Sequence, residues 1–296
     1  MQTNARAVFL MRLIEGVQAD ERIVGLLQGG SGSEGRADQW SDVDVFLFVR
    51  DTDMEVFLQD WKRWIESCGR LLLAYNPDEQ AWIAWTIFHA DPVPLRVDFR
   101  FIPASQIESV RTWPTSPHSL QEIILDDKTN GVLSEVAQSL VGHSQRLPDV
   151  QEESTFEQYC NRMWYFLHSA FCKLERGDQW YARISLHLAV LDSLIALLKL
   201  ESGAVERWLA SFPSWKLERA LSPTRLNRLN TCIPLPGAEA LRQAMLNTAE
   251  LGRDVCEALA LQHGWAWPRE AAEEVIQMLT NKRHNILSVD GDRFTY

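Results

Sequence analysis

The sequence lacks an excess of basic residues. Its 296 residues include 40 Asp and Glu against 29 Lys and Arg, which gives a formal net charge of −11. Nucleic-acid binding draws on clustered cationic side chains and the release of counterions. The composition therefore argues against a general nucleic-acid binder. An acidic balance instead suits a metal ion or a small substrate that is cationic or neutral.

The sequence also lacks paired cysteines and long apolar runs. Its five cysteines form no CxxC pair and no metal-ligand spacing, so neither a zinc site nor a disulfide framework is expected. The longest apolar stretch, residues 186–200, is interrupted by Asp192 and Lys199, so we expect no membrane span. The first 21 residues predict an amphipathic helix rather than a signal peptide. We expect a cytoplasmic protein with reduced thiols.

The composition that remains is that of a folded protein. Hydrophobic residues make up 46% and charged residues 23%, which is enough for a sizeable core. The length suits two domains. A polar stretch with little periodicity, from Gly142 to Gln151, indicates the boundary between them. We predict a first domain over residues 1–145 and a second over residues 150–296.

The pattern of apolar residues differs between the two halves. In the first half, period-two alternation and short apolar runs predict strands at 23–28, 43–49, 71–75, 82–89 and 94–102, with a helix after residue 52. In the second half, helical periodicity predicts helices at 156–176, 181–200, 223–229, 238–263 and 268–282. The fold class is therefore α+β (α/β), a sheet domain with flanking helices followed by an all-α bundle.

Three short motifs of the first half could act together. Gly30-Ser31 follows the first strand, Asp42 and Asp44 share one face at the start of the second, and Asp98 lies in a later alternating strand. A Gly-Ser turn lets backbone N–H groups approach a phosphate closely. Two carboxylates at positions i and i+2 of a strand suit Mg²⁺, and a third can complete the site or act as a base.

Each motif alone has an ordinary structural interpretation. A Gly-Ser pair is usually a turn, and an Asp-x-Asp at a strand start is often a solvated edge. The combination is more specific, because clustered carboxylates on apolar strands are costly without a cation. For Arg96 and Arg100, which flank Asp98 on its face, we favour ion pairs with surface acids over phosphate contacts.

The segment GGSGSEGRADQWSDVDVFLFV resembles the signature of the polymerase-beta-type nucleotidyltransferase superfamily. With IFHADPVPLRVDF and LERGDQWYARISLHLAVLDSLIALL, it is most similar to the antibiotic nucleotidyltransferases. Lincosamide enzymes come first in this resemblance and streptomycin-type aminoglycoside adenylyltransferases second. The resemblance is specific over residues 20–101 and looser to about residue 222.

The resemblance implies a mixed sheet that bears the active site, a helical C-terminal domain, and transfer of a nucleoside monophosphate from a Mg²⁺-bound NTP, ATP in the first place, to a drug hydroxyl. By this resemblance Asp42 and Asp44 hold the metals, two ions in all. Asp98 is the third ligand or the base. The nucleotide-binding set comprises Gly30, Ser31, Ser33 and Lys173.

Lys173 has two interpretations. Streptomycin-type relatives also carry a lysine in the corresponding helix, so its cation could hold the triphosphate. A lysine near the end of a helix also interacts favourably with the helix dipole. The sequence leaves both open.

The acceptor is the least determined part of the function. We expect a small molecule with a free hydroxyl, a lincosamide first, with a streptomycin-type aminoglycoside as the alternative. Transfer to RNA or to a protein, as in toxin–antitoxin systems, is a further alternative. A monomer and a homodimer both fit the sequence.

Overall fold

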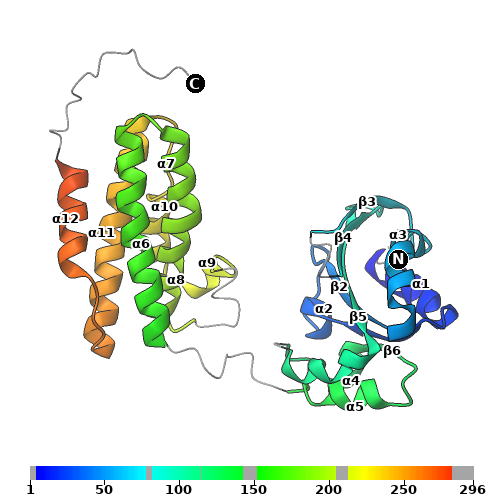
Figure 1. The fold of residues 1–296 in the computed structure, drawn as a ribbon. Helices are drawn as coiled ribbons and strands as arrows, with labels where there is room; N and C mark the ends of the chain where they lie inside the picture. The colour runs from blue at the N-terminus through cyan, green and yellow to red at the C-terminus, as the bar shows by residue number, and fades with distance from the viewer. Residues whose placement is uncertain (1–4, 78–81, 114, 143–151, 205–212, 282–296) are drawn as a thin grey trace. The chain divides into compact units, whose positions relative to one another are not determined.

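The computed structural model describes residues 5–77, 82–113, 115–142, 152–204 and 213–281 (Figure 1). The chain divides into two compact units, Met1–Gln145 and Arg146–Tyr296. Each has its own hydrophobic core and is described by itself. Most of the expected seam, residues 143–151, lies outside the described residues.

The first unit is built on a six-stranded sheet with the order β3-β4-β5-β2-β1-β6. Its strands are β1 (Ile23–Gln28), β2 (Val43–Val49), β3 (Leu71–Tyr75), β4 (Ile83–Phe88), β5 (Leu95–Pro103) and β6 (Ile124–Asp127). β2 and β5 are parallel, whereas the other neighbouring pairs are antiparallel. The sheet is mixed, as expected.

Two helices cover one face of this sheet, α1 (Ala5–Ala19) and α3 (Met54–Glu66) (Figure 1). The alternating residues Val97, Phe99 and Phe101 of β5 point to this face and are buried. The ring centroids of Phe57 in α3 and Phe101 lie 5.4 Å apart. The period of two therefore leaves Arg96, Asp98 and Arg100 on the other face.

The second face is covered over only part of its area. The segments η2 (Ala104–Thr112), α4 (Leu120–Ile123) and α5 (Val132–Gln138) build a small core with Leu27, Phe48 and Leu133. On the β3 and β4 side of this face, Tyr75 and Trp85 are exposed. This open part of the sheet borders the carboxylates described below.

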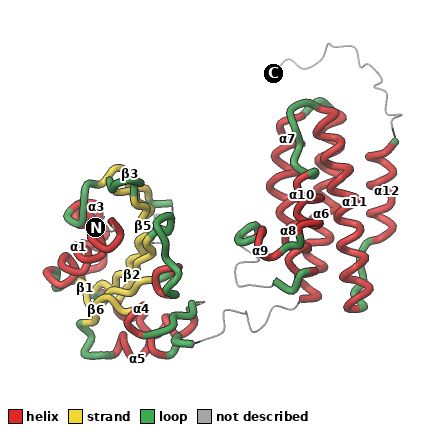
Figure 2. The backbone as a smooth tube through the Cα atoms, turned by 180° about the vertical axis from the view of Figure 1, so that it is seen from behind, coloured by secondary structure: helices red, strands yellow, loops and turns green. Residues whose placement is uncertain are grey.

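The second unit is all-helical (Figure 2). Its helices are α6 (Glu152–Glu175), α7 (Gln179–Ser185), η3 (Leu186–Leu191), α8 (Asp192–Glu201), α9 (Leu217–Ala220), α10 (Pro223–Asn230), α11 (Ala238–His263) and α12 (Arg269–Thr280). α6 packs against α7, η3, α8, α11 and α12 around one apolar core. The expected α+β fold class is confirmed. In the described part of the chain, no helix has the length and apolarity that a membrane span requires.

Three expectations about elements need correction. Gly30-Ser31 opens a short helix, α2 (Gly30–Ser33), rather than a simple turn. The single helix expected over 181–200 is divided by the π-helical segment η3. The helix expected over 268–282 ends at Thr280, and residue 282 lies outside the described residues.

Candidate active site

The sheet register brings three carboxylates together. Asp44 of β2 pairs with Asp98 of the parallel neighbour β5, and Asp42 lies immediately before β2. One oxygen from each of the three side chains lies within 4.8 Å of the other two. All three are partly buried on the face opposite α1 and α3. Residues separated by more than fifty positions in the sequence thus form one acidic cluster.

The electrostatics of the cluster fit a divalent cation. Burial raises the pKa of Asp44, and the neighbouring charge of Asp98 raises it further, against the opposing effect of Arg6 and Arg100. Burial also raises the pKa of Asp98, although Arg96 and Arg100 oppose this shift. The arginines therefore do not compensate the cost of holding these carboxylates ionised. Mg²⁺ prefers oxygen ligands of this kind, so the three residues fit the metal that the resemblance implies.

Arg96 contacts two members of the acidic cluster. Its guanidinium forms an ion pair with Asp42, and its Nε lies 3.8 Å from Asp98 Oδ1. The ion-pair interpretation is therefore confirmed for Arg96, but its partners belong to the cluster instead of being unrelated surface acids. The strand period explains this, since Arg96 and Asp98 share a face.

The loop after β1 fits closely against Asp44. The Gly29 N–H donates to Asp44 O at 2.9 Å, which fixes the loop beside β2. Gly30 has a φ of +55°, and a Cβ at this position would lie 2.0 Å from Asp44 Oδ2. Only a glycine fits both the backbone conformation and the space. The loop therefore approaches the carboxylates as closely as a chain can.

The two serines of α2 differ in what their hydroxyls do. Ser31 Oγ is buried, and among the described residues it has no hydrogen-bond partner. Ser33 Oγ donates to Gly30 O at 3.0 Å and lies 3.3 Å from Thr115 Oγ1. Ser31 thus has an unpartnered hydroxyl in the loop that contacts Asp44, whereas Ser33 stabilises the loop itself.

Arg6 and Gln28 belong to this site but carry no sequence signal. Arg6 reaches from α1 and donates to the backbone carbonyl of Asp42. Gly32 lies against both side chains, because a Cβ there would be 2.2 Å from Arg6 Nη2 and 2.3 Å from Gln28 Nε2. In the sequence, Arg6 cannot be distinguished from a solvent-exposed arginine of an amphipathic helix. Its role depends on tertiary structure alone.

A cavity of about 740 Å³ adjoins the acidic cluster. Its lining includes Arg6, Trp40, Asp42, Pro92 and Arg96. Trp40 is 73% exposed, so its ring is available for stacking on a base or a drug. The cavity is large enough for a nucleotide-sized ligand.

Lys173 lies in α6 of the second unit. Its Nζ is 3.9 Å from Asp178 Oδ2 and 4.9 Å from the centroid of the Tyr181 ring. These contacts are those of a helix-end lysine. They leave its charge partly exposed, and the nucleotide-binding interpretation stays a prediction.

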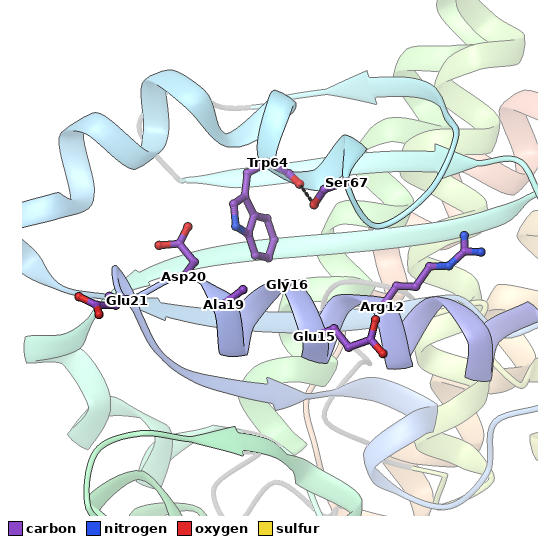
Figure 3. Close-up of a pocket in the computed structure, with 8 residues that line it drawn as sticks. All are labelled: Arg12, Glu15, Gly16, Ala19, Asp20, Glu21, Trp64 and Ser67. Carbon is purple, nitrogen blue, oxygen red and sulfur yellow. Dashed lines mark hydrogen bonds between the residues drawn. The ribbon is translucent and has the colours of Figure 1, made fainter.

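A second hollow, of about 620 Å³, lies between α1 and α3 (Figure 3). Its lining includes Arg12, Glu15, Asp20, Trp64 and Ser67, and Ser67 Oγ donates to the Trp64 carbonyl at 2.6 Å. The two helices cover the sheet face opposite the carboxylates. This hollow is therefore separate from the acidic cluster.

Of three comparisons with known proteins, the one with protein families gives a match over most of the chain. The model of the family described as streptomycin adenylyltransferase matches residues 4–282. No curated protein gives a significant match. Among solved structures, an aminoglycoside 6-adenyltransferase from Bacillus subtilis is 14% identical, with 94% of this chain and 98% of that chain covered and a TM-score of 0.43.

Proposed function

The chain belongs to the streptomycin adenylyltransferase family, and we propose from this premise that it transfers AMP from ATP to a hydroxyl of a streptomycin-type aminoglycoside. The chain is a nucleotidyltransferase, as expected. The family match supports the aminoglycoside alternative better than the lincosamide acceptor that the resemblance placed first. The closeness to lincosamide enzymes is not supported by any comparison.

In this proposal the loop after β1 binds the triphosphate. Ser31 donates its unpartnered hydroxyl to a phosphate oxygen, and the backbone at Gly30 lets the phosphates approach Asp44. Asp42 and Asp44 hold Mg²⁺, two ions in the proposed arrangement, with Asp98 close enough to share in the site. When bound, Mg²⁺ neutralises charge on the phosphates and on the leaving pyrophosphate.

We assign Asp98 as the general base that takes the proton from the acceptor hydroxyl. It lies on β5, on the side of Asp44 away from the loop, so an acceptor hydroxyl can reach it without crossing the phosphates. The hydroxyl oxygen attacks the α-phosphorus, the bond to pyrophosphate breaks, and the hydroxyl proton passes to Asp98. The protein contributes mainly position and electrostatics.

The observation that carries the proposal is the convergence of the three carboxylates beside Gly30, where a Cβ would overlap with the Asp44 side chain. The test incubates the full-length protein and Mg-ATP with streptomycin, other aminoglycosides, a lincosamide, tRNA and bulk protein. Pyrophosphate release and product mass are the readouts. We expect release together with an AMP adduct of streptomycin.

Two variants separate the assigned roles. Asp42→Asn should weaken binding of the Mg²⁺-bound nucleotide, whereas Asp98→Asn should lower kcat and leave nucleotide affinity close to wild type. Asp60→Asn, in α3 on the opposite face, is the matched control. Release with a lincosamide, tRNA or protein and not with aminoglycosides would replace the proposed acceptor.

A further inference from the structure

We propose that Trp85 and Tyr75 form the platform on which the acceptor binds beside Asp98. The inference rests on the proposed function and adds residues that no sequence motif marks. Trp85 lies in β4 and Tyr75 ends β3, the strand at the edge of the sheet. We call these two residues the aromatic platform.

The strand register places the aromatic platform in one row with the carboxylates. Tyr75 pairs with Trp85, Trp85 pairs with Asp98, and Asp98 pairs with Asp44. Directly paired residues on neighbouring strands point to the same face of a sheet, about 5 Å apart. The row therefore runs from Tyr75 across Trp85 and Asp98 to Asp44, and Gly30 lies against Asp44 at its end.

The aromatic platform faces outward in its own unit. Trp85 is 46% exposed and Tyr75 is 54% exposed. Their ring centroids are 5.9 Å apart at 51°, so the two rings support each other. Ile83 and Ile87, which flank Trp85 on the same face of β4, are half-buried and add apolar surface. Two large aromatic side chains exposed next to charged residues are typical of a binding surface.

The geometry of phosphoryl transfer decides which ligand takes this place. The attacking and leaving oxygens lie roughly in line through the phosphorus. Pyrophosphate must leave toward the phosphate-binding loop, which contacts Asp44 at Gly30. The acceptor then approaches from the opposite end of the row. That end is occupied by Asp98 and, next to it, Trp85.

The chemistry of the aromatic platform fits a cationic, ring-bearing acceptor. An indole face attracts a guanidinium or ammonium group and also packs against the apolar face of a sugar-like ring. Two arginines lie diagonally beside Trp85 on this face. Arg96, opposite Ile87, is ion-paired with Asp42, and the charge of Arg100, opposite Ile83, is opposed by those of Asp44 and Asp98. An aminoglycoside carries rings, hydroxyls and cations together.

The kinetic test compares Trp85→Ala with Trp85→Phe in the full-length protein, with streptomycin and Mg-ATP varied separately. Trp85→Ala should raise the KM for streptomycin about tenfold, the scale of one partly desolvated cation–π contact. The KM for ATP should stay within about twofold. Trp85→Phe, which keeps an aromatic face, should recover most of the loss.

Val56→Ala is the matched control, since Val56 is an exposed apolar residue of α3 on the opposite face. It should change neither KM. A rise in the KM for ATP in Trp85→Ala, with the KM for streptomycin unchanged, would assign the aromatic platform to the base and overturn the inference. Thermal unfolding of each variant checks that the sheet is intact.

A binding experiment keeps the inference separate from the proposed function. In protein labelled with ¹⁵N at the indole nitrogens, the Trp85 resonance is identified by its absence from Trp85→Phe. We expect it to shift when streptomycin is added with Mg²⁺ and a non-hydrolysable ATP analogue. A shift on addition of the analogue alone, or no shift with streptomycin, contradicts the inference. Absence of AMP transfer despite such a shift contradicts the proposed function only.

Discussion

At the scale of single residues, Asp44 has the most constrained position in the site. Its carboxylate lies beside Gly30, pairs across the sheet with Asp98, and is partly buried. Burial first and the charge of Asp98 second raise its pKa, so its ionised form destabilises the folded state when no cation is bound. Function and stability therefore make opposite demands on this residue.

Asp44→Asn should lower kcat/KM at least about a hundredfold, because it removes a metal ligand charge worth several kcal/mol. The variant should be at least as stable as wild type in EDTA, since the amide needs no counterion. Addition of Mg²⁺ should raise the Tm of wild type and leave that of Asp44→Asn nearly unchanged. Thermal unfolding with and without Mg²⁺ checks this. A variant that stays active, or that gains as much Tm from Mg²⁺ as wild type, would contradict the metal assignment.

Gly30→Ala tests the close approach of the loop to Asp44. A left-handed φ costs an alanine about 1–2 kcal/mol, and the overlap with Asp44 should add about 1–3 kcal/mol. Gly131→Ala is the control, because Gly131 also has a positive φ but a Cβ there meets nothing within 4 Å. Chemical denaturation measures both. Equal losses in the two variants would mean that the loop moves away at no cost.

The residues of the candidate site divide into two groups by how the sequence reports them. Asp42, Asp44 and Gly30 stand within one short segment, so spacing alone points to them. Arg6 and Trp85 do not, because their roles come from a helix that reaches Asp42 and from a strand pairing that places Trp85 opposite Asp98. A single sequence contains no information on which strands pair.

At the scale of elements, period-two alternation, helical periodicity and short apolar runs each predict boundaries that the structure has. Residues 23–28, 43–49 and 71–75 were expected as strands and have these limits in β1, β2 and β3. The 26-residue helix α11 was also expected in full. Residues 104–142 received no assignment, since η2, α4, β6 and α5 are each too short to show a period. The π-helical segment η3 keeps the apolar pattern of its neighbours and is hidden for that reason.

One short connection, between β6 and α5, is stabilised in part by the carboxylate of Asp127. Asp127 Oδ1 accepts from Thr129 N at 2.8 Å, and Oδ2 accepts from Ser134 N at 3.0 Å and from Ser134 Oγ at 2.6 Å. Burial acts to raise the pKa of Asp127, but the hydrogen bonds from Ser134 and Thr129 outweigh it and lower the pKa. The carboxylate thus acts as a cap that connects strand and helix.

Asp127→Ala should lower the free energy of unfolding by about 1–2 kcal/mol at neutral pH, as loss of a cap does. Because the pKa of Asp127 is lower in the folded state than in the unfolded state, the ionised carboxylate stabilises the fold at pH values above the unfolded-state pKa. This stabilisation is lost as the carboxylate becomes protonated below about pH 4. The difference from wild type should therefore shrink at low pH. Urea denaturation between pH 3 and 7 measures it, with the exposed Glu135→Ala as control. A difference that is constant with pH would exclude the charge as its cause.

At the scale of the whole molecule, the net charge of −11 acquires a local meaning. Three of the 40 acids meet in one cluster whose geometry fits a divalent cation, so part of the negative charge belongs to the proposed metal site. The apolar cores are also separated. One lies entirely in the helical unit and two lie entirely in the sheet unit. Each unit thus has the means to fold alone.

We expect fragments 1–145 and 150–296 each to unfold in one cooperative transition, because neither loses part of its core when separated. Circular dichroism should show a mixed α and β signal for the first fragment and a purely helical one for the second. The full chain is the control. A first fragment without a cooperative transition would contradict residues 1–145 as a domain.

For Lys173 we predict, from the resemblance, a contact between its ammonium group and the triphosphate. A triphosphate carries more negative charge than the loop hydroxyl and N–H groups can balance, so a further cation lowers its energy when bound. Lys173→Ala should then raise the KM for ATP several-fold, and Lys173→Arg should recover part of it. Removal of the contacts to Asp178 and Tyr181 alone would cost about 0.5–1 kcal/mol of stability and leave the KM unchanged.

Lys62→Ala is the matched control, because Lys62 lies 6.0 Å from the Trp61 ring in α3, far from the carboxylate face. An unchanged KM for ATP in Lys173→Ala, together with a small loss of Tm, would leave Lys173 as a helix-end residue of the second unit.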